Sequence, residues 1–371
     1  MALQNVGTPR FYVDTISWLK AIGIGTARGE ESNPTDYGST ESVYDIWGSD
    51  ASNPYIASTG LAPGTGGGDR YFKYNYNWVD GVAWRPHLSY NFVAYLGHKL
   101  ADFNGAMEDF GFYKHYDDTY TYHPEIIDAV NFVATTDSYG GFGLPTHDGF
   151  SIVMIDPSPS GDVEYGSGVG IWMHNRTGIE YQIGKVIAGN YFDMPHSPDL
   201  NLKLSYEMDG VKTIQTKGGA TLSNASYTKP ADWGDRGAWQ LSNSQSEGWL
   251  DNLKGYNYRN GRRVWDLSFS YLSDSDVFPE NAGNTLSQWS EEGDFETNIL
   301  DGTDFFSQVW NRTMGGHLPF IFQPDAGGGV EGQGNFNADQ FALCRFDMKS
   351  LQYEQVANNV YNVKLKIREC W

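Results

Sequence analysis

Turn-forming residues recur so often along this chain that long helices have little room between them. The 371 residues include 44 Gly and 15 Pro. Both residue types interrupt helices and mark the turns that separate short strands. Aromatic residues, which suit the pleated surface of a sheet, make up 15% of the chain. The sequence therefore predicts a mainly β protein.

Three segments in the second half alternate apolar and polar residues, as a strand with one dry face and one wet face does. They are NLKLSYEM from Asn201, VWDLSFSYL from Val264 and YNVKLKIRE from Tyr361. After the first of them, Asp209-Gly210 predicts a tight hairpin turn into the next strand. This pattern indicates antiparallel sheets in a sandwich or barrel.

The first half carries its apolar residues in short runs between polar loops. Residues 71–123 are rich in aromatic residues but have a mixed period. Residues 150–155 and 169–173 are nearly continuous apolar runs, which predict a pair of buried strands. We expect two parts, a β-rich and loop-rich elaboration at 1–185 and a second β domain at 186–371.

One segment of the second half has helical spacing. Apolar residues recur three to four positions apart within LDGTDFFSQVWNRTMGG and predict a packed α-helix at about 303–314. Asp301 or Thr303 can cap its start, and Gly315 can end it in the left-handed conformation. The helix should lay its aromatic face on the sheet.

The strand that follows this helix, HLPFIF, lies between glycine clusters and carries a lone histidine, His317. We expect Phe320 and Phe322 to point to one face and Ile321 to the other. Such a strand is buried on both sides, under its helix and against a neighbouring sheet. His317 could belong to a catalytic set, but a structural role is favoured because no partner motif accompanies it.

A long segment at 229–263 is rich in aromatic residues and glycine. Structured loops of this length in compact folds are more often functional than accidental. We expect an arm that contacts a neighbouring subunit, with these candidate contact residues: Trp233, Trp239, Trp249, Tyr256 and Tyr258.

No motif in the chain assigns a catalytic, cofactor-binding or metal-binding residue. Gly184-Lys185 is followed by Val186, so it lacks the hydroxyl of a phosphate-binding loop. The nearest approach to a metal cluster has no diagnostic spacing and is better explained as a solvated polar loop. It consists of His115, Asp117, Asp118, His123 and Glu125. We therefore expect no enzyme and no cofactor.

The charge of the chain excludes one broad class of function. The formal net charge is −21, and the clustered Lys and Arg that neutralise phosphates are missing, which argues against a sequence-independent nucleic-acid binder. Cys344 and Cys370 are the two cysteines, too few for a disulfide framework. The first twenty residues lack a signal-peptide pattern, and no apolar stretch is long enough to span a bilayer. A soluble protein without membrane contact is expected.

The order of segments at the C-terminal end resembles a family of bacteriophage tail proteins. The resemblance rests on GRRVWDLSFSYLSDSDVF, FFSQVWNRTMGGHLPFIFQPD, FALCRFD and YNVKLKIRE, and it covers mainly residues 186–371. The opening NVGTPRFYVD also resembles the start of such virion proteins, particularly in marine and cyanobacterial phage. The motifs are structural rather than catalytic.

The resemblance implies a β domain of tail-tube type in the virion tail, made in the host cytoplasm. Its partners would be copies of itself in a ring of three- or six-fold symmetry, and other tail or baseplate proteins. A distal tail or baseplate ring is favoured over a repeated tube, which the large first half would crowd. DNA would only pass through a lumen, where an acidic wall weakens its adhesion.

Two alternatives remain open from the residues. Abundant aromatic residues at 71–122 and 233–258 would suit a receptor-binding or carbohydrate-binding virion protein. Abundant acids beside these aromatics would suit a glycan-degrading tail enzyme, which needs two carboxylates at a suitable separation. The sequence singles out no such pair.

Overall fold

The computed structural model of the chain confirms a mainly β fold. It describes residues 6–31, 46–47, 55–57, 68–75, 78–79, 82–83, 90–98, 107–115, 121–122, 126–130, 145, 149–155, 168–175, 181–207, 211–225, 262–279, 303–326 and 340–370. Every strand pairing in these ranges is antiparallel. The described strands form open sheets rather than a closed barrel.

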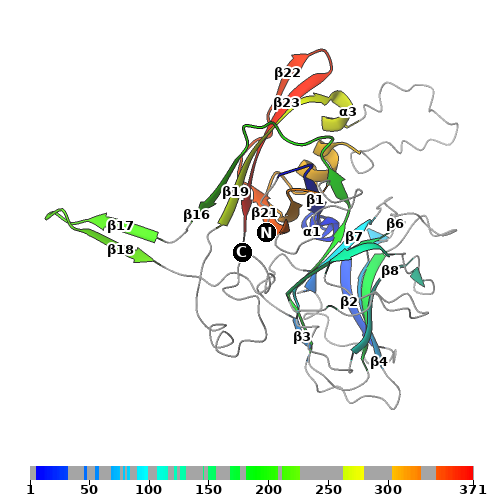
Figure 1. The fold of residues 1–371 in the computed structure, drawn as a ribbon. Helices are drawn as coiled ribbons and strands as arrows, with labels where there is room; N and C mark the ends of the chain where they lie inside the picture. The colour runs from blue at the N-terminus through cyan, green and yellow to red at the C-terminus, as the bar shows by residue number, and fades with distance from the viewer. Residues whose placement is uncertain are drawn as a thin grey trace.

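Three sheets make up most of the described structure (Figure 1). The eight-stranded sheet runs in the order β15 (Tyr191–Asp193), β1 (Arg10–Val13), β20 (Phe320–Gln323), β21 (Ala342–Phe346), β23 (Val360–Glu369), β19 (Arg262–Ser273), β16 (Lys203–Glu207), with β22 (Tyr353–Ala357) beside β23. The four-stranded sheet contains β10 (Ile126–Val130), β11 (Gly149–Ile155), β7 (Phe92–His98) and β14 (Lys185–Gly189). The five-stranded sheet contains β2 (Thr26–Glu31), β4 (Gly68–Asn75), β12 (Gly168–Asn175), β8 (Met107–His115) and β9 (Thr121–Tyr122).

Three strand pairs and three helices complete the described elements. The pairs are β13 (Tyr181–Ile183) with β3 (Tyr55–Ala57), β17 (Val211–Gln215) with β18 (Thr221–Ala225), and β5 (Trp78–Val79) with β6 (Val82–Ala83). The helices are α1 (Thr15–Ala21), α3 (Asp274–Val277) and the π-helix η5 (Phe306–Asn311).

The four-stranded sheet is the middle layer. Along β7, Val93 and Tyr95 enter one core together with residues of the five-stranded sheet. Phe92, Ala94 and Leu96 enter another core together with residues of β1, β20 and β21. Both faces of this sheet are therefore buried, which explains why its strands read as continuous apolar runs instead of alternating.

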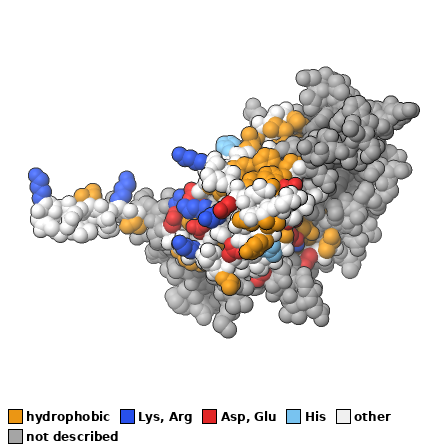
Figure 2. All heavy atoms as spheres, turned by 90° about the horizontal axis from the view of Figure 1, so that it is seen from above, with side chains coloured by type: hydrophobic (Ala, Val, Ile, Leu, Met, Phe, Trp, Pro, Cys, Tyr) orange, Lys and Arg blue, Asp and Glu red, His pale blue; other side chains and the backbone are white. Residues whose placement is uncertain are grey.

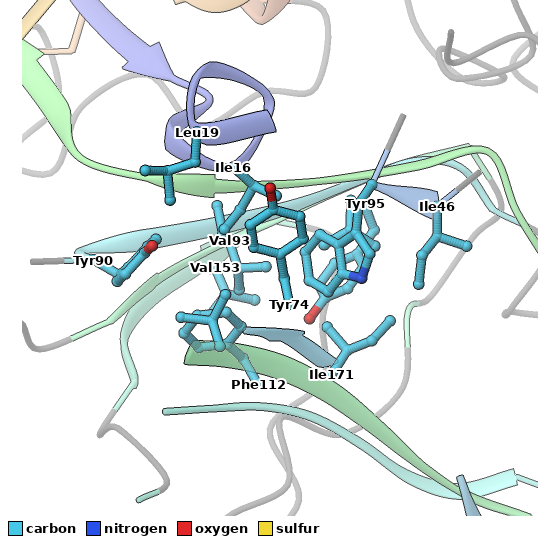
Figure 3. Close-up of a cluster of buried hydrophobic side chains, with 14 of the residues drawn as sticks. Ile16, Leu19, Ile46, Tyr74, Tyr90, Val93, Tyr95, Phe112, Val153 and Ile171 are labelled. Carbon is cyan, nitrogen blue, oxygen red and sulfur yellow. The ribbon is translucent and has the colours of Figure 1, made fainter. Parts of the chain in front are cut away.

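Helix α1 closes one side of the core between the four- and five-stranded sheets. Asp14 begins the helix by accepting a hydrogen bond from the Ser17 backbone N–H at 3.0 Å. Figure 3 shows Ile16 and Leu19 pointing from this helix toward Val93. Aromatic residues of this region, among them Tyr74 and Phe112, are buried in the same core.

The predicted helix at 303–314 exists but is shorter and wider. It is the π-helix η5, and Asp304 rather than Thr303 accepts a backbone hydrogen bond, from Ser307 at 2.9 Å. Asp301 lies outside the described residues. After the helix, the Gly315 N–H donates to the Trp310 carbonyl, five residues back. The predicted left-handed Gly315 is confirmed, with φ of +66°.

The aromatic face of η5 packs as expected. Phe305 and Val309 join the third core, which lies on the face of the eight-stranded sheet opposite the four-stranded sheet. Phe320 and Phe322 point into this core, while Ile321 points to the core with the four-stranded sheet. The prediction that this strand is buried on both sides is confirmed.

The three alternating segments are neighbours in one sheet, and the two apolar runs are buried strands as predicted, but the hairpin predicted at Asp209-Gly210 was wrong. β16 pairs with β19 rather than with the strand after Asp209-Gly210, because Leu204 then lies opposite Trp265 at the third core. The two apolar runs are both strands, β11 and β12, yet they lie in different sheets. A run that is apolar on both faces contains no information about its partner.

Strand pairs form across residue 185, where the sequence predicts the boundary between two parts. β1 lies between β15 and β20, although it precedes both by a long stretch of sequence. β14 begins at Lys185 and pairs with β7 of the four-stranded sheet. A cut between residues 185 and 186 would separate β1 from both of its neighbours.

Candidate assembly interface

The arm expected at 229–263 lies almost entirely outside the described residues. The candidate contact residues there are Trp233, Trp239, Trp249, Tyr256 and Tyr258, all outside the described ranges. Only Arg262 and Arg263 of this segment are described, and they open strand β19. Arg263 is buried and forms an ion pair with Glu369, so this end of the segment belongs to the sheet.

A second segment, the hairpin of β17 and β18 at 211–225, projects from the body (Figure 1). Figure 2, turned by 90° from that view, shows it again as a finger that points away from the layered sheets. The two views agree that it stands apart from the three sheets. We refer to residues 211–225 as the hairpin.

The hairpin is organised by its own turn. The Thr216 N–H donates to the Ala220 carbonyl at 2.8 Å, and the Thr216 hydroxyl accepts from the Ala220 N–H at 3.1 Å. Gly219 has a φ of +83°, which suits glycine. This turn fixes the register, which places Ile214 directly opposite Leu222.

The hairpin exposes apolar surface. The Ile214 side chain is 66% exposed and its cross-strand neighbour Leu222 is 60% exposed, and Val211 at the base is exposed as well. An isolated two-stranded hairpin is only marginally stable in water, because it has no sheet or helix to pack against. Contact with another surface would bury this pair and stabilise the hairpin.

The hairpin also differs in charge from the rest of the chain. Residues 211–225 contain Lys212 and Lys217 and no acidic residue, whereas the whole chain has a net charge of −21. Opposite charges on two surfaces steer their encounter and favour their contact. A second copy of this chain carries the same net charge of −21 and so is acidic overall.

One end of the eight-stranded sheet is a further contact surface. β16 is the last strand of the sheet order and pairs only with β19 among the described strands. Tyr206 on this strand is exposed, and Leu200, just before it, is fully exposed. Unpaired strand edges are templates for pairing with another chain.

The described residues provide little catalytic chemistry. They contain no group of three or more His, Cys, Asp or Glu placed to hold a metal ion. Of the residues weighed as metal ligands, only His115 is described, at the end of β8. His317 is exposed on the turn after η5. No helix in the described ranges is both long and apolar enough to cross a lipid bilayer.

The strongest pKa shifts belong to groups inside the cores. Burial raises the pKa of the Tyr95 phenol and of the Cys344 thiol well above their ordinary values. Burial also raises the pKa of Cys370 to about 11. These groups are neutral at physiological pH, and their shifts result from packing.

Sequence reasoning missed the hairpin, although a signal was present. Lys217-Gly218-Gly219 lies between two runs rich in β-branched residues, which is typical of a hairpin turn. No sequence pattern shows that such a hairpin leaves the body, because exposed and buried hairpins differ only in their neighbours.

Comparison with known proteins identifies no family for this chain. No family model matches it, and no curated protein matches it. Among solved structures, a β-galactosidase of Streptococcus pneumoniae, BgaA, is similar over 45% of this chain and 93% of that chain. The sequence identity is 11% and the TM-score is 0.27.

Proposed function

We propose that this chain is a structural component of a bacteriophage virion that assembles with copies of itself into a ring in the tail, at the distal tail or baseplate. The observation that carries the proposal is the hairpin, which projects from the body and exposes Ile214 and Leu222. A projecting arm of this kind gains its packing from a neighbour. Other tail or baseplate proteins would bind the outer surfaces of the ring.

The arrangement of the segments that resemble tail proteins supports the proposal. These segments contain β19, then η5 with β20, then β21, and then β23. Their strands are neighbours in the order β20, β21, β23, β19, although up to about a hundred residues separate them in sequence. The resemblance therefore covers one continuous sheet.

In the proposed ring, the hairpin of one subunit lies on the next subunit. Lys212 and Lys217 would face acidic surface, and the Ile214–Leu222 pair would be buried in the contact. In a closed ring, the hairpin of every subunit contacts a neighbouring subunit, whereas the hairpin of a monomer has no such contact. The ring, of three- or six-fold symmetry, would let DNA pass through an acidic lumen. We propose no catalytic role and no cofactor.

Native mass spectrometry and analytical ultracentrifugation of the full chain test this proposal. We expect a closed oligomer whose mass is a fixed multiple of the 41.4 kDa chain. A double variant, Ile214→Thr with Leu222→Thr, keeps strand propensity but removes apolar area, and it should weaken association at least about tenfold.

The matched control changes the opposite face of the same hairpin. Thr213 and Ser223 are cross-strand partners that are also exposed, so Thr213→Ala with Ser223→Ala leaves the apolar pair intact. This control should assemble as the parent does. A chain that stays monomeric up to about 100 μM would overturn the ring proposal, since a stable ring forms well below that concentration.

A further inference from the structure

A small pocket lies beside helix α1, away from the hairpin. It has a volume of about 250 Å³ and is lined by Ser17, Lys20, Ala21, His317, Leu318 and Arg345. These residues come from α1, from the turn after η5 and from β21. The volume suits a ligand smaller than a typical drug-sized molecule.

The lining is basic in an otherwise acidic protein. Lys20, His317 and Arg345 contribute basic nitrogen atoms, and the described lining residues include no Asp or Glu. All three side chains are exposed, so they can rearrange around a ligand. Among the described residues, no carboxylate forms an ion pair with His317 or Arg345.

The inner part of the pocket is held rigidly by buried polar contacts. The Lys185 ammonium, which is fully buried, donates to the Ser17 hydroxyl at 3.1 Å and lies 2.8 Å from the Asp14 carboxylate. Asp14 also accepts from the Ser17 backbone N–H. Because the Ser17 oxygen accepts from an ammonium, its own O–H is directed to another acceptor.

The donors on three elements converge on one small volume. The Ser17 hydroxyl lies at the inner side, and the Lys20, His317 and Arg345 side chains surround the opening. Asp14 neutralises Lys185 behind the pocket, so the charge that faces a ligand comes from the rim. Arg and Lys are the side chains that pair best with phosphate and carboxylate groups.

We propose that the pocket lined by Ser17, Lys20, His317 and Arg345 binds a small oxyanion, the phosphate or carboxylate group of a ligand. The ammonium of Lys20 and the guanidinium of Arg345 provide the charge, and Ser17 donates a neutral hydrogen bond. The His317 side chain adds a ring nitrogen to the lining. The proposal does not depend on ring assembly.

Isothermal titration of the full chain with sulfate tests the proposal. We expect a single site with a Kd of about 1 mM.

Two exposed basic residues, one in the pocket and one outside it, distinguish a specific anion site from general electrostatic attraction to the protein. Arg345→Gln should weaken sulfate binding about three- to tenfold, as expected for the loss of one hydrogen bond at an exposed site. Lys364→Gln removes one charge from an exposed position of β23 outside the pocket and should leave binding unchanged. Equal losses in the two variants, or no saturable binding, would overturn the proposal.

Two further probes identify the group that the pocket prefers. Inorganic phosphate and acetate are titrated under the same conditions, the first for a phosphate ligand and the second for an acidic side chain. If either probe binds and Arg345→Gln abolishes that binding, the result supports the oxyanion site and shows whether the pocket takes a phosphate or a carboxylate group. Binding that Arg345→Gln does not affect contradicts it.

Discussion

At the scale of single residues, a buried ion pair connects β19 and β23, the two longest neighbouring strands. Arg263 on β19 donates from Nε and Nη2 to Glu369 Oε1 at 2.9 and 2.8 Å, and its backbone N–H donates to Oε2 at 2.6 Å. Burial alone would lower the pKa of Arg263, but the adjacent Glu369 charge raises it. Both side chains are therefore charged inside the protein.

Removing one partner of this pair should cost far more than removing both. Arg263→Met leaves the Glu369 carboxylate buried without its countercharge, and we expect a loss of about 3–5 kcal/mol in the free energy of unfolding. The double variant Arg263→Met with Glu369→Leu should recover most of that loss. Urea denaturation measures both, and a double variant no more stable than the single one would contradict the argument.

His317 shows where sequence reasoning stops at this scale. The prediction that it is no part of a catalytic set stays untested. Two other residues of the pocket, Ser17 and Arg345, are distant from His317 in sequence. Ser17 precedes it by hundreds of residues, and Arg345 follows it only after strand β20. Only the folded sheets bring them together, so no spacing in the sequence could indicate this pocket.

At the scale of elements, the turn after η5 determines how closely the helix approaches the sheet. Gly315 and Gly316 both have positive φ, +66° and +91°. A Cβ on Gly316 would lie 2.9 Å from the Phe346 carbonyl oxygen and from its Cβ, whereas a Cβ on Gly315 would lie 3.4 Å from Trp310 Cζ2. The two positions therefore share positive φ but differ in the room available for a Cβ atom.

This difference predicts unequal costs for the same substitution. Gly315→Ala should lower the free energy of unfolding by about 1 kcal/mol, the cost of left-handed backbone in alanine. Gly316→Ala adds a clash with backbone atoms of β21 and should cost about 3 kcal/mol. Thermal unfolding of the two variants measures this, and equal shifts in Tm would argue against the close contact.

Elements with one wet face were predictable, and elements without one were not. The alternation in β16, β19 and β23 identified strands that the structure places side by side. The continuous runs of β11 and β12 indicated burial but not their partners, because both faces are apolar. The width of η5 was also unpredictable, since a helix of 6 residues is too short for its apolar pattern to distinguish α from π geometry.

At the scale of the whole molecule, the chain crosses between layers more than its sequence suggests. β1 and α1 follow one another directly, yet β1 belongs to the eight-stranded sheet and α1 packs on the core next to the five-stranded sheet. The buried contact of Lys185 with Asp14 joins β14 to this same corner. The layers are therefore linked through one short N-terminal segment.

This linkage predicts that the second half does not fold well by itself. A fragment of residues 186–371 lacks β1, which covers the edge of β20. It also lacks β7, β10 and β11 of the four-stranded sheet, which packs on Ile321 and Leu343. We expect it to be insoluble or to bind a hydrophobic dye and melt without cooperativity. Cooperative thermal unfolding of the fragment, matching that of the full chain, would show that the halves are independent.

Adding residues 6–13 to the fragment provides the graded control. The extension restores the strand between β15 and β20 but leaves the core with the four-stranded sheet uncovered. Solubility should improve while dye binding persists.

The position of β1 also has a consequence for how the protein is made. The Tyr12 hydroxyl donates to the Gln323 side-chain oxygen at 2.7 Å, and 311 residues separate the two along the chain. At about 5–20 residues per second, the ribosome needs about 15–60 s to complete that stretch, and Phe11 and Tyr12 cannot reach their partners on β20 before then. The yield of folded protein therefore depends on what shields these two rings while translation continues.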